Sequence, residues 1–292
     1  MSCNVCPRKC AHRKGGFCGV GEKIIVGRIA PHFWEEPVIS GTNGSGTVFF
    51  SGCNLRCVFC QNRLISKELV GKEVTAKELN ERICALVDAG VHNINFVTPT
   101  HYAQFLAEFL EIYHYPVPIV YNSSGYESEQ SLEALRGKVD IFLPDFKYSD
   151  DALALRYSAA PHYAQTAMRA IEKMYELVGD VQTDEQGIMQ KGVIVRHMML
   201  PNAHENTLGV IDMFDTLTRG KKILFSLMSQ YTPYGDLSAF AELQRKITRE
   251  EYEKALSYTS LLGIDGFCQE LDSAGEIYIP PFSDTLDGKE LQ

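Results

Sequence analysis

Residues 51–63 read SGCNLRCVFCQNR and place three cysteines, Cys53, Cys57 and Cys60, within eight positions. The trio follows the apolar run TVFF (47–50), which indicates a buried strand. The loops that follow the strands of α/β proteins are where such folds carry their chemistry. A closed zinc site takes four ligands, whereas three thiolates on a four-iron cluster leave one iron open to a further ligand. The trio therefore predicts a reactive iron–sulfur site, with inert buried thiols as the alternative.

The overall composition excludes several classes of function. The 292 residues suffice for one large α/β domain or a barrel with a small appendage, and 45% hydrophobic residues can form its core. A net charge of −9 argues against a nucleic-acid partner. No run approaches the roughly 18 apolar residues of a membrane span, and the N-terminus has no apolar signal core. We therefore expect a cytoplasmic protein with nine reduced cysteines, whose clusters bind metal rather than form disulfides.

Predicted strands and helices alternate six times between residue 47 and about residue 228. A capping box of Thr75 and Glu78 starts the best-marked helix, and Thr248 with Glu251 starts the last one. Six β/α units predict an α/β fold with a curved parallel sheet, short of the eight units of a closed barrel. The strands of these units are expected at residues 47–51, 93–97, 117–121, 139–146, 192–200 and 222–228, and a further short strand is expected at EKIIVGRI (22–29).

The chain is expected to divide into three parts. Residues 1–40 would form a cysteine-rich metal-binding segment with a linker, and residues 41–235 the core. Residues 236–292 would form a C-terminal helical extension that packs on the core. The Gly-rich stretch GTNGSGT (41–47) leads into a strand, whereas a phosphate-binding loop follows one, so we interpret it as a linker.

Four further cysteines near the N-terminus have the spacing C-x2-C-x3-C-x7-C: Cys3, Cys6, Cys10 and Cys18. Four thiolates complete a tetrahedral zinc site, and they can also bind a second iron–sulfur cluster that relays electrons. About twenty residues do not bury a core of their own, so a metal is expected to hold this segment together. We interpret the two remaining cysteines, Cys84 and Cys268, as packing residues.

The spacing C-x3-C-x2-C, with the aromatic Phe59 directly before the last cysteine, resembles the signature of the radical SAM superfamily. The surrounding sequence GCNLRCVFCQN is similar to that of pyruvate formate-lyase activating enzyme and its relatives. The stretch EEPVISGTNGSGT (35–47) and the CPR-type cysteine cluster resemble an uncharacterised branch of those homologues. The resemblance covers about residues 45–235.

This resemblance implies an open partial (β/α)6 barrel that binds a [4Fe-4S] cluster through Cys53, Cys57 and Cys60. S-adenosylmethionine (SAM) would bind the fourth iron. An electron from the cluster would split SAM into methionine and a 5′-deoxyadenosyl radical, which removes a hydrogen atom from a substrate. Relatives with extra clusters carry them after the trio, so cysteines ahead of it favour structural zinc over a second cluster.

The resemblance also implies which residues contact SAM. The stretch VTPTHY stands where relatives have a Gly-Gly-Glu segment, so threonines replace a carboxylate there. Asp145 and Lys147, in DFK, would be pocket residues or an ordinary salt bridge. Arg196 would donate to the SAM carboxylate as a fork or tether the end of its strand. We interpret His101 and His197 as structural. The expected cofactor-binding residues are Phe59, Thr98, Thr100, Asn122, Ser123, Asp145, Lys147 and Arg196.

Three functions remain open at this point. The first is a radical SAM enzyme that activates a glycyl-radical enzyme, and the second is one that acts on a small molecule or another peptide. The third is a non-catalytic iron–sulfur electron carrier, which would gain from a fully ligated cluster and is therefore disfavoured by three cysteines. The expected partners are an electron donor such as flavodoxin or ferredoxin and, for the first function, the glycyl-radical enzyme. Neither nucleic acid nor a membrane is expected.

Overall fold

The computed structural model describes residues 3–10, 16–271 and 282. Ten strands form its sheet in the order β10-β9-β8-β6-β5-β4-β2-β1-β3, with β7 paired to β8. The strands are β1 Ile25–His32, β2 Ser45–Phe50, β3 Lys72–Glu73, β4 Ile94–Val97, β5 Ile119–Ser123, β6 Ile141–Pro144, β7 Gln182–Thr183, β8 Met189–Met198, β9 Leu224–Met228 and β10 Gly266–Cys268. The α-helices are α1 Pro37–Ser40, α2 Arg63–Ser66, α3 Ala76–Asp88, α4 Ala103–Ile112, α5 Glu129–Glu133, α6 Asp151–Ser158, α7 Tyr163–Val178, α8 His204–Thr218 and α9 Arg249–Leu261.

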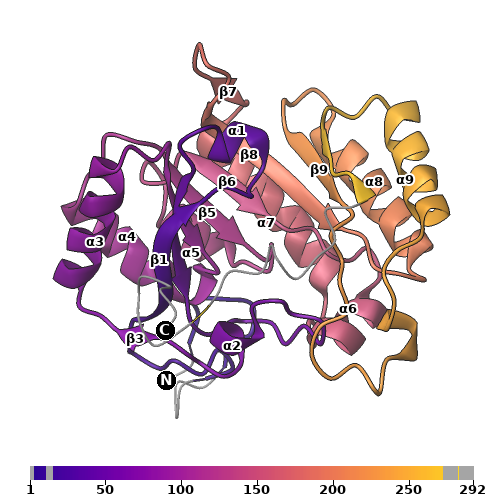
Figure 1. Cartoon of the computed structure of the whole chain (residues 1–292), viewed down its shortest axis with the longest axis horizontal. Coiled ribbons are helices and arrows are strands. Elements are labelled where there is room, and N and C mark those ends of the chain that lie inside the picture. The colour runs from indigo at the N-terminus through magenta and orange to yellow at the C-terminus, as the bar shows by residue number, and fades with distance from the viewer. Residues whose placement is uncertain (1–2, 11–15, 272–281, 283–292) are drawn as a thin grey trace.

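The strands from β2 through β4, β5, β6 and β8 to β9 are parallel neighbours, as the alternation of strands and helices predicted. The path ends at β10 on one side and at β3 on the other, so the sheet does not close. The predicted α/β fold with an open partial barrel is confirmed. Figure 1 shows α3 and α4 on one flank of this sheet and α8 and α9 on the other.

Four strands, β1, β3, β7 and β10, join the six predicted parallel ones in the sheet. β1, which precedes the expected boundary at residue 40, pairs antiparallel with β2. β10, which belongs to the expected C-terminal extension, pairs parallel with β9. The edge strand β10, and β1 next to the other edge strand β3, therefore come from segments outside the six-unit repeat.

Capping boxes mark where the two most clearly predicted helices begin. Thr75 accepts a hydrogen bond from the Glu78 amide at the start of α3, and Thr248 accepts one from the Glu251 amide at the start of α9. In each case the glutamate side chain returns a bond to the cap residue, so two free N–H groups are satisfied at once. Both predicted helix starts are confirmed.

The segment at residues 37–44, interpreted as part of a linker, folds as the short helix α1 followed by a turn. Pro37 stands in the first turn, where its missing N–H costs nothing. Gly41 has φ 46°, and a Cβ there would lie 2.7 Å from Nε2 of His92, so glycine is required at this turn. The helix places the side chain of Ile39 inside the barrel.

Ile39 belongs to an apolar cluster that fills one end of the barrel interior. Successive side chains of a strand point to opposite faces of the sheet, so each strand contributes only some of its residues to this interior. These side chains form the floor below the site: Ile39, Val120, Ile141, Leu143, Met189 and Ile194, all of them fully buried. Within the described residues, no helix combines the length and apolar character needed to cross a membrane.

Candidate functional site

The three cysteines of residues 51–63 lie in the loop between β2 and α2, at the carboxyl end of β2. Each thiol sulfur is close to a hydrogen-bonding group. The Leu55 amide donates to Cys53 Sγ at 3.3 Å, the Ser158 hydroxyl donates to Cys57 Sγ at 3.0 Å, and the Ser66 hydroxyl lies 3.3 Å from Cys60 Sγ. Hydrogen bonds to sulfur are one means by which proteins tune iron–sulfur clusters.

The thiols are largely buried and close enough to act on one another. Burial raises the pKa of Cys53 to about 12, and the neighbouring thiols Cys57 and Cys60 contribute to this rise. Burial and Cys57 likewise raise the pKa of Cys60. Three mutually repelling thiolates are favourable only with a cation between them, and binding a metal would remove their protons. The donor set therefore suits a metal cluster.

A cavity of about 580 Å³ opens beside the trio, a size typical of ligand sites. Cys57, Phe59 and Cys60 line one side of it. Phe59 is fixed by an edge-to-face contact with Tyr231, with ring centroids 5.8 Å apart. The remaining walls come from β1, α1 and the inward side chains of the sheet: His32, Glu35, Glu36, Phe49, Val97, Asn122, Asp145, Lys147, Arg196, Met198, Ser226 and Met228 are among them.

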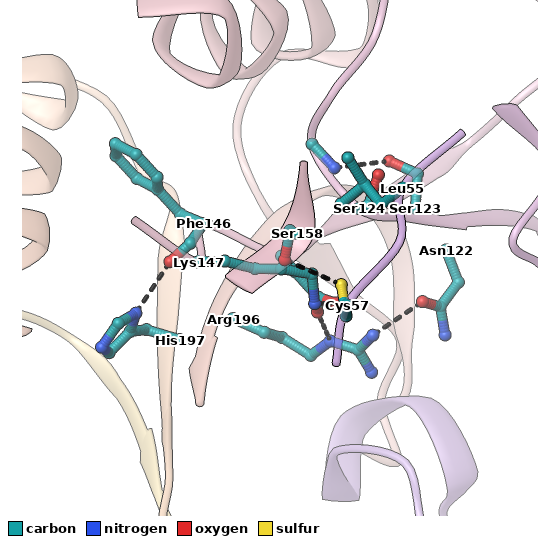
Figure 2. A network of polar contacts seen from close by, with 12 residues as sticks. Leu55, Cys57, Asn122, Ser123, Ser124, Phe146, Lys147, Ser158, Arg196 and His197 are labelled. Atoms are coloured by element: carbon teal, nitrogen blue, oxygen red, sulfur yellow. Dashed lines mark hydrogen bonds and ion pairs between the residues drawn. The ribbon is translucent and has the colours of Figure 1, made fainter. Parts of the chain in front are cut away.

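Arg196 organises a polar layer above the apolar floor. Its Nε donates to Asp145 Oδ1 at 2.9 Å, its Nη1 to Glu35 Oε2 at 2.8 Å, and its Nη2 to Asn122 Oδ1 at 2.7 Å. Figure 2 shows the guanidinium reaching toward Asn122 beside Cys57. Burial alone would lower the pKa of Arg196, but Asp145, Glu36 and Glu35 outweigh it and raise that pKa. Every nitrogen of the guanidinium thus has an acceptor within the protein.

Lys147 is the cation that acts most directly on the trio. Burial raises the pKa of Cys53 and of Cys60, and the Lys147 ammonium opposes this rise. Cys57 in turn raises the pKa of Lys147. Nζ donates to Asp145 Oδ2 at 2.6 Å, which uses one of the three N–H donors of a lysine. The other N–H donors of Lys147 are therefore available to a ligand on the cluster side of the cavity.

Three of the expected cofactor-binding residues are not among the described residues that line the cavity: Thr98, Thr100 and Ser123. The Thr98 amide donates to the carbonyl of Asn122 at 2.9 Å, which ties the end of β4 to β5. The Thr100 hydroxyl donates to Glu127 at 2.5 Å, and Ser123 Oγ accepts from the Gly125 amide at 3.3 Å. The other five expected residues all line the cavity.

Of the two histidines in these segments, His197 is buried and His101 is half-buried, and both are bonded to the protein. His197 contacts the carbonyl of Phe146 at 2.7 Å and the hydroxyl of Thr207 at 3.0 Å. His101 Nε2 lies 2.8 Å from the carbonyl of Ser51. Burial lowers the pKa of each to about 4, so both are neutral at pH 7. These contacts favour structural roles.

The interpretation of Cys84 and Cys268 as packing residues is wrong. Both are exposed, Cys84 on α3 and Cys268 on β10, and Cys268 lines the cavity. Cys84 faces outward because α3 turns its apolar side, including Ile83, toward the sheet. Among the other lining residues missed from the sequence are the polar side chains of Glu35, Glu36 and Ser226, which α1 and β9 bring to the cavity.

The N-terminal cysteines lie next to the trio. Cys3 and Cys10 are joined by a backbone hydrogen bond of 2.7 Å, and both thiols act electrostatically on Cys6 and Cys18. A Cβ at Gly52, directly before Cys53, would lie 2.8 Å from the carbonyl of Cys18. The two cysteine-bearing segments therefore pack against each other, and only glycine fits at their contact.

Arg8 connects the two sets. Its Nε donates to the carbonyl of Asn54 at 2.8 Å, and its guanidinium lies 3.8 Å from the centre of the Phe17 ring. The charges of Cys6, in the N-terminal set, and of Cys53, in the trio, both act on it. Across the described residues, no three His, Cys, Asp or Glu side chains converge as the ligands of one metal ion do.

The fold and the site together define a partial β/α barrel with a three-cysteine loop at the carboxyl end of its first parallel strand. The radical SAM superfamily profile matches residues 47–208, more than half of the chain. The chain belongs to the radical SAM superfamily.

Two curated relatives come from Methanocaldococcus jannaschii. The chain is 28% identical over 277 residues to the uncharacterized protein MJ0674, covering 90% of this chain and 76% of that protein. It is 28% identical over 178 residues to the uncharacterized protein MJ0808, covering 52% of this chain and 50% of that protein.

Solved structures share the fold at low identity. SuiB of Streptococcus suis, bound to SAM, superposes with a TM-score of 0.50 at 13% identity over 74% of this chain, and the match spans 47% of SuiB. Methylornithine synthase gives 0.50 at 13% identity over 77% of this chain and 70% of that one. A single-residue variant of spore photoproduct lyase gives 0.51 at 12% identity over 75% and 74%. These similarities show the fold alone.

Proposed function

We propose that the chain is an enzyme that cleaves SAM reductively at a [4Fe-4S] cluster held by Cys53, Cys57 and Cys60. The observation that carries this proposal is the trio of free thiols, with two of its cysteines opening onto a cavity of about 580 Å³. Soft thiolates are the ligands that iron–sulfur clusters take, and one loop supplies three of them. When bound, the cluster and SAM would supply a 5′-deoxyadenosyl radical for hydrogen abstraction from a substrate.

The residues around the cavity suit the remaining tasks. Lys147, with donors to spare, would bind the carboxylate of SAM, while Asp145 holds the lysine in place. Phe59 and Phe49 give the cavity apolar walls that limit access of water to a reactive carbon. Arg196 would keep Asp145 and Asn122 positioned, since its donors are taken up by them and by Glu35.

Anaerobic reconstitution tests this proposal. Protein loaded with iron and sulfide should become brown, and with dithionite and SAM it should release 5′-deoxyadenosine and methionine, measured by liquid chromatography. Reconstituted protein that contains about four irons per chain and releases no 5′-deoxyadenosine would refute the enzyme and favour an electron carrier.

Replacing Lys147 with Met should weaken SAM binding about tenfold or more, because a charge-assisted hydrogen bond in a buried site is lost. Titration of the reconstituted variant with SAM measures the effect. Lys77→Met is the matched control, because Lys77 is an exposed lysine on α3, outside the cavity. Equal SAM affinities of the Lys147 variant and the wild type would limit Lys147 to its salt bridge with Asp145.

For the N-terminal cysteines, we propose a second iron–sulfur cluster rather than zinc. Ligands of one zinc ion lie within about 4 Å of each other, given Zn–S distances of about 2.3 Å, and no such group occurs among the described residues. A four-iron cluster is wider and is bound by thiolates farther apart. The contact of Gly52 with Cys18 sets this segment against the trio, as electron relay requires.

Replacing Cys6 and Cys10 together with Ser should lower the iron content from about eight to about four per chain. Activity with a protein electron donor, such as flavodoxin or ferredoxin, should then fall more than activity with dithionite, because dithionite reaches the trio's cluster without a relay. Metal analysis and the two assays make this measurement. Wild-type protein with about four irons and one zinc would refute the second cluster and support the structural zinc that the sequence favoured.

Activation of a glycyl-radical enzyme is one form that the proposed function can take. It predicts that the chain, incubated with SAM, reductant and such an enzyme, produces a glycyl radical detectable by electron paramagnetic resonance. A small molecule or another peptide is the alternative hydrogen donor, and the properties of the cavity described next bear on that choice.

A further inference from the structure

Glu36 is a buried carboxylate that the protein leaves without a complete set of partners. It stands at the N-terminus of α1, is 7% exposed, and lines the cavity. Its Oε2 atom accepts no hydrogen bond from any described residue. Arg196 Nη1 lies 4.0 Å from that atom, but this nitrogen already donates to Glu35 at 2.8 Å. A buried acceptor without a donor costs free energy, so the position of Glu36 in the cavity wall calls for an explanation.

Burial raises the pKa of Glu35 and of Glu36, so a further cation is needed to keep all three carboxyl groups of the polar layer ionised. The carboxyl groups and cations of this layer are Glu35, Glu36 and Asp145 against Arg196 and Lys147. Direct hydrogen bonds pair Arg196 with Glu35 and Asp145, and Lys147 with Asp145, which leaves Glu36 as the carboxyl group in excess. His32 does not balance it, because burial and then Arg28 and Arg196 lower its pKa to about 4 and keep the ring neutral at pH 7.

The wall around Glu36 suits a ligand with one polar end. The hydroxyl of Ser226 lies against the carboxyl group and helps to stabilise its charge. Met198 and Met228 line the same cavity, and methionine adapts its shape to a variety of apolar ligands. A chain of methylene groups ending in a cation would match both features.

We propose that the substrate carries a protonated primary amine and that Glu36 binds this amine. The proposal rests on the proposed function, since it concerns the compound from which hydrogen is removed. An ammonium group supplies the missing donor to Oε2 and the missing positive charge together, and its alkyl chain packs on the methionines.

Two other cations are less suited to this position. No three acidic, histidine or cysteine side chains within the described ranges converge on one point, so a divalent ion has no ligand set there. SAM also carries an ammonium group, but its carboxylate is proposed to bind Lys147, on whose charge Cys57 of the trio acts. Glu36 instead lies beside Arg196, with its Oε2 4.0 Å from Nη1, and Arg196 and Glu35 are the charged groups that act on it most.

The test titrates holoprotein, loaded with cluster and SAM, with pentylamine and with 1-pentanol, which has the same length but no charge. Methionine methyl groups labelled with 13C report the position of binding. Pentylamine should bind about tenfold more tightly than pentanol and shift the methyl signal of Met228, while Met213, on the outer helix α8, stays unchanged. Equal binding of the two probes by the wild type overturns the proposal.

Glu36→Gln removes the charge and keeps the shape, so the variant should lose the preference for the amine while binding pentanol as before. Glu172→Gln is the matched control, because Glu172 is exposed on α7 and away from the cavity. A Glu36→Gln variant with weaker SAM binding and an unchanged amine preference overturns the proposal, since Glu36 would then bind SAM. If this variant does not fold, the comparison of the two probes on the wild type decides.

The 5′-deoxyadenosine assay on the wild type tests the proposed enzyme independently of the amine site. Release of 5′-deoxyadenosine without an amine preference refutes the amine site alone. An amine preference without 5′-deoxyadenosine refutes the enzyme and leaves Glu36 as an amine-binding group.

Discussion

Replacing Cys57 with Ser should abolish release of 5′-deoxyadenosine, with a loss of more than about 100-fold, because even the loss of a group that supports a metal ligand costs about 10- to 100-fold. A hard hydroxyl is a poor ligand for iron–sulfur clusters. The Ser158 hydroxyl, now 3.0 Å from the thiol, would also lose its acceptor sulfur. Absorbance of the reconstituted protein and chromatography of the products measure the two effects.

Cys84→Ser is the matched control for this change. Cys84 is exposed on α3, and its sulfur makes a weak contact of 3.8 Å with the side-chain oxygen of Asn80. This variant should keep both the brown colour and the activity. Unchanged 5′-deoxyadenosine release by the Cys57 variant would disprove the assignment of the cluster to the trio.

The fold was predictable to the extent that each strand has its own apolar run. The six parallel strands follow directly from such runs, and the capping boxes at Thr75 and Thr248 mark helix starts with specific side chains. The helix α1 was missed because four residues are too few to show a helical period. β10 was missed for the same reason, since three residues with an exposed glycine carry no strand pattern.

The site was predictable where one short segment carries it and not where the fold assembles it. Cys53, Cys57 and Cys60 sit within one loop, so their spacing alone predicts a shared ligand. Glu35 and Glu36 lie far from the trio in the sequence, and adjacent acidic residues usually indicate exposed surface. Only α1, which turns the chain back into the barrel, brings them to the cavity.

Arg196 shows how such assembly changes a residue's expected role. The resemblance implied a fork that donates to SAM, with a tether of the strand end as the alternative; in the structure the guanidinium donates to Asp145, Glu35 and Asn122. These acceptors come from separate strands of the barrel and from the segment before α1. The arginine therefore holds the polar layer together, and its largest effect is expected on stability.

Replacing Arg196 with Met should lower the free energy of unfolding by about 3–5 kcal/mol, because Glu35 and Asp145 would stay buried with an uncompensated charge. Lys should restore only part of this loss, since a point charge does not reach three acceptors in three directions. Chemical denaturation of the reconstituted proteins measures the effect. Arg219→Met is the control: Arg219 is 75% exposed and pairs with Asp215 on α8, so its loss should cost about 1 kcal/mol or less.

A second variant separates charge from packing. If the buried charge of Glu35 causes the loss, then Glu35→Gln should destabilise the wild type, where it removes an ion pair of 2.8 Å, and should recover stability in the Arg196→Met background. The opposite signs of these two effects would show that the two side chains are coupled. A loss below about 1 kcal/mol in Arg196→Met, with additive effects of Glu35→Gln, would mean that the polar layer is held by packing rather than by its ion pairs.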